Sequence, residues 1–147
     1  MSTLMTATPI SMNIMHGYSI FSTGIVIQLH VVGMFLPSLF TGNLIKIYGH
    51  KNIIYSGIII LLICIFINFS FESYYGFMTG LILLGIGWNF LFISGTSLLV
   101  ISYDDENKFL SQGLNDFVVF STQAIGSLYA VFLLYFFHFV YRLFLRP

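Results

Sequence analysis

Long apolar stretches, separated by short polar segments, make up most of the chain. No Asp, Glu, Lys or Arg occurs before Lys46, and between Asn52 and Tyr103 the only such residue is Glu72. About 20 apolar residues cross the hydrocarbon core of a bilayer as a helix. Backbone groups find no water there, so each span is expected to bond within itself as an α-helix. The pattern predicts an all-α polytopic transmembrane bundle, with residues 1–147 forming a single transmembrane region and four spans at about 19–40, 53–71, 75–101 and 114–137.

Charged residues in the connecting segments indicate an orientation. Lys46 and Lys51 lie in the expected first loop, Glu72 in the second, and an acidic run at 104–108 in the third. Lys and Arg favour the cytoplasmic side, which places the first and third loops inside and Glu72 outside. Two arginines of the tail then fall outside, against this rule: Arg142 and Arg146.

Composition excludes several classes of protein. The chain is 58% hydrophobic and only 7% charged, whereas a soluble domain carries roughly 25% charged residues. The apolar runs do not alternate as the strands of a membrane barrel do. A net charge of zero gives no support to nucleic-acid binding, and the single Cys64 excludes an internal disulfide or a multi-thiolate zinc site. Residues 1–17 lack the basic start of a signal peptide and could form the end of another helix.

Small residues in the third span indicate close helix packing. Gly76, Gly80 and Gly87 are separated by four and seven residues, so they fall near one face of a helix with 3.6 residues per turn. A groove of this kind lets a neighbouring backbone approach closely. The three glycines are therefore predicted to form a helix-packing surface.

Several segments resemble one family of transporters. The pattern Gly42-x-Leu44-x4-Gly49-x-Lys51 is similar to the short cytoplasmic loop of the major facilitator superfamily, although Lys46 stands where that loop usually has an acidic residue. That departure is more typical of the loop in the C-terminal half. Four further segments resemble a bacterial branch of the family in the same order: Ala7–Met12, Ile27–Gly42, Gly85–Leu99 and Gln112–Phe120.

The resemblance implies part of a twelve-helix carrier, about helices eight to eleven. Such carriers move solutes by rocking two halves around a central site. The chain would then be a truncated segment, about a third of a carrier, and would need a missing carrier half as its partner.

Ionisable residues within lipid are costly, so each is a candidate for function. His30 lies in the middle of the first span, where it could contact a proton or solute, or could be a neutral side chain bonded to a neighbouring helix. Asp116 is expected in the first turn of the fourth span, with Asn115 beside it as a helix cap. Alternatively, Asp116 could face Lys51 or a pore, in a polar stripe that continues to Gln123.

Uncharged polar residues supply the other candidates for the substrate or proton pathway. Trp88 and Asn89 lie near the middle of the third span, away from the interfaces where Trp usually anchors. They could contact a polar solute or bridge two helices. Gln28 is a similar but weaker candidate, and Pro37 is expected to kink the first span.

Two functions remain open from sequence. The first is transmembrane transport of a small solute in a bacterial inner membrane, with or without coupling to protons. The second is a stand-alone four-helix membrane protein that associates with itself as an exporter, or with another membrane protein as a non-transporting subunit. No catalytic triad, phosphate loop, metal-ligand spacing or cofactor motif is present in the sequence, so an enzyme is not expected.

Overall fold

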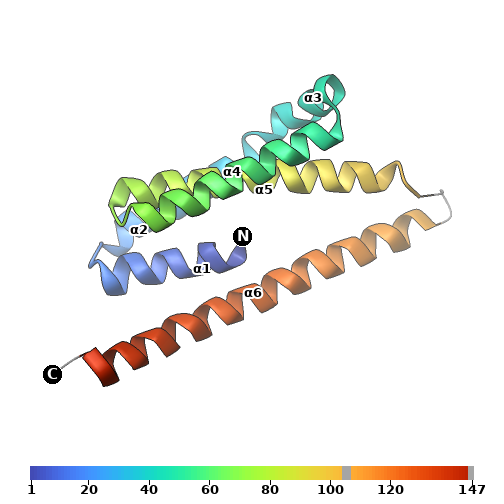
Figure 1. The fold of residues 1–147 in the computed structure, drawn as a ribbon. Coiled ribbons are helices and arrows are strands. Elements are labelled where there is room, and N and C mark those ends of the chain that lie inside the picture. The colour runs from blue at the N-terminus through green and yellow to red at the C-terminus, as the bar shows by residue number, and fades with distance from the viewer. Residues whose placement is uncertain (104–106, 146–147) are drawn as a thin grey trace.

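The protein folds entirely into helices over the part that the structure describes. The computed structural model describes the backbone of residues 1–103 and 107–145, and the side chains of residues 1–103 and 107–136. These ranges contain helices and turns and no strand, which confirms the predicted all-α fold (Figure 1). In chain order the elements are α1 (Ser2–Ile10), the π-helix η1 (Ser11–Met15), α2 (Ile20–Phe35), α3 (Ser38–Tyr48), α4 (His50–Ser70), α5 (Tyr74–Val100) and α6 (Lys108–Leu145).

Four helical segments are long and apolar enough to cross a membrane. They are Ile20–Tyr48, which joins α2 to α3, His50–Ser70, Tyr74–Val100 and Lys108–Phe136. Ser19 and Ser73 cap α2 and α5, because their side chains accept hydrogen bonds from the backbone N–H groups of Ser22 and Gly76. The chain is therefore an integral membrane protein by the length and composition of its helices.

The first connection is much shorter than the sequence suggested. Residues 41–53, predicted as a loop, are helical except for Gly49, which alone separates α3 from α4. Gly49 has a φ of +81°, a conformation that residues with a side chain rarely adopt. Gly42, expected in the same loop, lies inside α3 with open space beside it.

Helix α5 is the centre of the bundle. It packs along α4 on one side and along α2 on another, and α3 contacts it near its C-terminal half. Figure 1 shows α4 and α5 lying side by side over most of their length. Of its apolar span, 44% of residues are buried, more than in any other described span.

The N-terminal segment connects α6 to the rest of the protein. Helix α1 lies between α6 and the group formed by α2, α4 and α5 (Figure 1). The hydroxyl of Ser2 donates to the backbone carbonyl of Gln123 at 2.7 Å, and that of Thr3 donates to the carbonyl of Gly126 at 3.2 Å. A hydrogen bond of 3.3 Å joins the hydroxyls of Thr6 and Ser127. Only 6% of the apolar span of α6 is buried.

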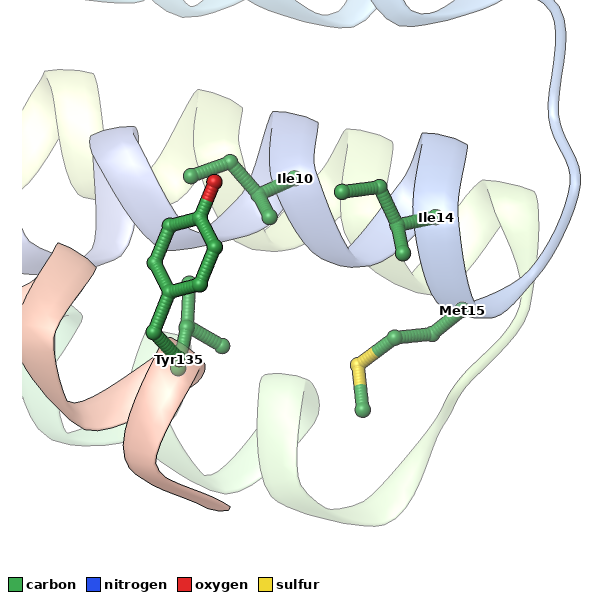
Figure 2. Close-up of a pocket in the computed structure, with 5 residues that line it drawn as sticks. Ile10, Ile14, Met15 and Tyr135 are labelled. Atoms are coloured by element: carbon green, nitrogen blue, oxygen red, sulfur yellow. The ribbon is translucent and has the colours of Figure 1, made fainter. Parts of the chain in front are cut away.

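A small apolar gap remains where this segment meets the later part of α6. Its volume is about 120 Å³, and Figure 2 shows Ile10, Ile14 and Met15 facing Tyr135 across it. The fifth lining residue is Leu134. Since aliphatic and aromatic groups supply nearly all of this lining, the gap is best understood as imperfect packing between the two segments.

Some charges used in the orientation argument cannot be placed. The acidic residues Asp104, Asp105 and Glu106 lie outside the described residues, as do the side chain of Arg142 and all of Arg146. The orientation inferred from them stays a prediction.

Candidate functional site

Glycine contacts set the positions of the helices around the site. Gly85 on α5 faces α2 so closely that an added Cβ atom would lie 2.5 Å from the carbonyl oxygen of His30. Gly33 on α2 faces the backbone of Ile82 in the same way, at 2.8 Å. Backbone atoms cannot yield as side chains do, so the two helices can approach this closely only because both positions are glycine.

The predicted glycine face lies on the opposite, α4 side of α5. Gly80 packs against Asn68 of α4, and Gly87 against Leu61 and Gly57 of the same helix. Gly76 packs against Phe71, the residue that ends α4. The surface offered by these glycines is therefore occupied within the chain.

His30 is completely buried between α2 and α5. Its Nδ1 atom lies 2.8 Å from the backbone carbonyl of Leu81. A carbonyl only accepts, so Nδ1 carries the proton in this bond. Its Nε2 atom has no hydrogen-bond partner among the described residues. The geometry matches the interpretation of His30 as a side chain bonded to a neighbouring helix, and leaves one ring nitrogen unused.

Asn89 bridges the break between α2 and α3. Its side-chain Nδ2 donates to the carbonyl of Met34 at 2.6 Å, and the Thr41 hydroxyl lies 2.7 Å from its Oδ1. The same hydroxyl lies 2.8 Å from the carbonyl of Pro37, and with one proton it donates to one acceptor at a time. The carbonyls at the end of a helix lack intrahelical partners, and Asn89 satisfies that of Met34. Of the two roles expected from sequence for Asn89, contact with a solute or a bridge between helices, the geometry matches the bridge.

A cavity of about 440 Å³ opens beside this bridge, between α2, α5 and α6. It contains three of the seven predicted pathway residues, Trp88, Asn89 and Gln123, which come from two different helices. Trp88 stacks on Phe92 with ring centroids 5.6 Å apart and planes 19° apart. The remaining lining residues are Met1, Met34, Phe35, Ser38, Ile93 and Phe120.

The other four predicted pathway residues lie elsewhere. His30 is buried outside the cavity lining, and Gln28 is exposed on α2. The side-chain Nδ2 of Asn115 donates to Oδ1 of Asp116 at 3.2 Å. Since α6 begins at Lys108, both lie beyond its first turn, so their predicted roles at the N-terminus of that helix are wrong. Asp116 has no ion pair with Lys51 among the described residues, and Lys51 is exposed.

Sequence reasoning did not find several residues that shape the site. Thr41 and Met34 are the hydrogen-bond partners of Asn89, and Phe92 stacks on Trp88 beside the cavity. The sequence predicts Thr41 in the first loop, whereas the structure places it in α3, four residues after Pro37. No group of three or more His, Cys, Asp or Glu side chains among the described residues could hold a metal ion.

Comparison with known proteins shows what the sequence is similar to. Over 92% of the chain, 38% of residues are identical to the riboflavin transporter RfnT of Brucella anthropi. Two uncharacterized MFS-type transporters of Bacillus subtilis, YdeG and YddS, are 39% and 34% identical over 86% of the chain. The chain is related to major facilitator-type transporters.

This major facilitator relationship covers most of the chain and a minor part of each transporter. The chain spans about a third of the length of the curated relatives that it matches, 34% of RfnT, 30% of YdeG and 29% of YddS. No protein-family model matches the chain, and no solved structure does. All three relatives carry the names of transporters.

Proposed function

We propose that this chain is a segment of a major facilitator-type carrier that moves a small solute across a bacterial inner membrane. The observation that carries the proposal is the match of 86% or more of the chain to three named transporters, at 34–39% identity. The order of the segments that resemble the family supports a place at about helices eight to eleven. The small-molecule solute, the missing carrier half and the proton coupling are parts of this proposal.

The cavity supports a position on the solute pathway. Phe35 and Phe120 line it yet remain 65% and 59% exposed, so the cavity is open at the surface of this chain. In a complete carrier the solute site lies between the two halves. An open cavity that contains Trp88, Asn89 and Gln123 is the kind of surface that a second half would close.

His30 is the candidate for proton coupling. Its imidazole is completely buried, and Nε2, which has no hydrogen-bond partner among the described residues, is the ring nitrogen that would accept a proton. Proton coupling through His30 predicts that His30→Ala removes the pH dependence of uptake while the amount of protein in the membrane stays the same.

A chimeric carrier tests the proposed function. The matching segment of RfnT is replaced with this chain, and riboflavin uptake is measured in cells that cannot make the vitamin. Uptake well above that of cells with the chain alone is the expected result. A chimera that reaches the membrane as a folded, monodisperse protein and moves no riboflavin or other solute offered would refute the proposal.

The alternative function, self-association, was motivated by the glycine face of α5. The glycines that suggested a contact between two copies already pack against α4 and Phe71 of the same chain. Of the two functions, a segment of a carrier is therefore the better supported.

A further inference from the structure

His16 lies at the end of the N-terminal segment, outside the four membrane spans. It follows the π-helix η1, and its Nδ1 atom lies 3.2 Å from the backbone carbonyl oxygen of Ser11. A carbonyl only accepts a hydrogen bond, so Nδ1 carries a proton. Tyr18 stacks on the imidazole with ring centroids 6.2 Å apart, and Phe77 of α5 packs edge to face with it at 5.3 Å. These contacts fix the orientation of the ring.

The second ring nitrogen faces the connection between α4 and α5. Nε2 of His16 lies 3.6 Å from Oε2 of Glu72, a side chain that is 79% exposed. Figure 1 shows this connection and the end of the N-terminal segment at the same end of the bundle. At this distance the contact is an ion pair rather than a hydrogen bond. It is therefore attractive only when the ring is charged, because a neutral ring with its proton on Nδ1 turns a lone pair toward the carboxylate.

Glu72 is the only acidic or basic partner of His16 among the residues that the structure describes. Helices α1, η1, α2 and α5, which surround the ring, contain no Asp, Glu, Lys or Arg. The other titratable side chains of the cluster are the phenols of Tyr18 and Tyr74. Tyrosine as a class is uncharged over the range in which histidine titrates. The charge of the imidazole itself therefore decides the strength of the contact.

We propose that His16 and Glu72 form a proton-dependent clasp, which holds the N-terminal segment against the α4–α5 connection while the imidazole carries two protons and weakens when it loses one. Histidine changes charge between about pH 5 and 8. The clasp is closed at the acidic end of this range, and its contribution is lost as the pH rises. Since α1 carries the hydroxyls that bond to α6, the clasp fixes one end of the segment that positions α6.

Hydrogen exchange of the full chain in lipid nanodiscs measures the clasp. The backbone N–H of Tyr18 donates to the carbonyl of Met12 at 2.9 Å, so protection of this amide reports local opening of the segment. Protection is corrected for the intrinsic exchange rate at each pH. It is expected to fall about threefold to tenfold between about pH 5.5 and about pH 8, because the ion pair is lost and the Nδ1 bond no longer has a charged donor. The amide of Leu84, in the middle of α5, should show no such change.

Substitutions separate the charge of His16 from its shape. His16→Gln cannot gain a charge, so its protection at acidic pH should match that of the unmodified chain at about pH 8. His16→Arg is charged at both pH values and should remove the pH dependence. The matched control is His50→Gln, since His50 bonds to Ser97 between α4 and α5, away from the clasp, and its loss should leave the pH dependence at Tyr18 intact. Circular dichroism and size-exclusion profiles establish that each variant is folded, and Glu72→Gln, which should weaken the pH dependence, serves if the His16 variants are not.

The proposal is overturned if protection of Tyr18 is equal at the two pH values, if a folded His16→Gln variant retains the full pH dependence, or if His50→Gln abolishes it. The inference goes beyond the proposed function and can fail separately from it. A pH-dependent clasp in a chain whose chimera moves no solute keeps the clasp and refutes transport. Uptake by the chimera together with pH-independent protection does the reverse.

Discussion

At Gly85 a single hydrogen atom in place of a side chain determines how close α5 lies to α2. An added Cβ would meet the carbonyl oxygen of His30 at 2.5 Å and the backbone of Gly33 at 2.9 Å. Gly85→Ala is expected to lower the free energy of unfolding by about 1–3 kcal/mol, the usual cost of overpacking. The measurement is reversible denaturation of the purified chain in detergent.

Gly95→Ala is the matched control on the same helix, because an added Cβ there meets nothing within 4 Å. Its stability should be unchanged or raised by up to about 1 kcal/mol, since alanine favours helix over glycine. Equal losses in the two variants would contradict the assigned contact between α5 and α2.

Residue-scale prediction from sequence succeeded where spacing carries information and failed where partners matter. The intervals between Gly76, Gly80 and Gly87 indicated one packing face, and all three contact α4 or its end. Spacing cannot name the opposing helix, so a second copy of the chain remained possible. Gly85 and its partner Gly33 belong to no repeated pattern, and only the three-dimensional arrangement shows their role.

At the scale of elements, the break at Pro37 divides the first span into α2 and α3. Proline has no N–H to continue the helical ladder, and beside this break Asn89 of α5 donates to the Met34 carbonyl. Asn89→Leu and Thr41→Val are expected to destabilise the chain non-additively. The coupling energy should be about 0.6 kcal/mol, with about 1.7 as the upper range for membrane helices.

Hydrogen exchange at residues 36–41 gives an independent measurement of the same bridge. Exchange there should rise in Asn89→Leu, while the amides near Gly57 of α4, which lies on the other side of α5, should be unaffected. Full additivity of the two substitutions, together with unchanged exchange, would show that the bridge contributes nothing to the break.

The four membrane segments were predictable because apolar composition extends over each of them, but their ends were not. Lys46 and Asn43 looked like loop residues, yet they lie on the exposed surface of α3. Helix α6 starts at Lys108, six residues before the predicted beginning of the fourth span. Helical hydrogen bonding continues into the polar boundary of the membrane, where hydrophobicity no longer marks it.

At the scale of the whole molecule, α6 depends on the N-terminal segment for its position. Its main contacts are with α1, and the hydroxyls of Thr6 and Ser127 lie 3.3 Å apart. With Cys64 replaced by Ala, a Thr6→Cys/Ser127→Cys pair should oxidise to a disulfide at least about tenfold faster than a distant pair, because the two positions approach disulfide geometry. Mass spectrometry of proteolysed, oxidised protein measures the linked fraction.

Thr6→Cys/Thr122→Cys is the control pair, because Thr122 is exposed on α6 and its hydroxyl bonds within that helix. Comparable oxidation of the two pairs would place α6 elsewhere. The cavity depends on this same placement, since Gln123 and Phe120 come from α6. Sequence therefore supplied three cavity residues without showing that they meet.

Gly49 has a consequence for how the protein enters its membrane. One residue joins α3 to α4, and Lys46 and Lys51 flank that joint on either side. Positive charges resist crossing to the outer side. A single-residue connection is too short for one span to insert while the other remains in water. The connection therefore predicts that the two spans insert together as a helical hairpin, and the orientation expected from sequence would keep its basic apex in the cytoplasm.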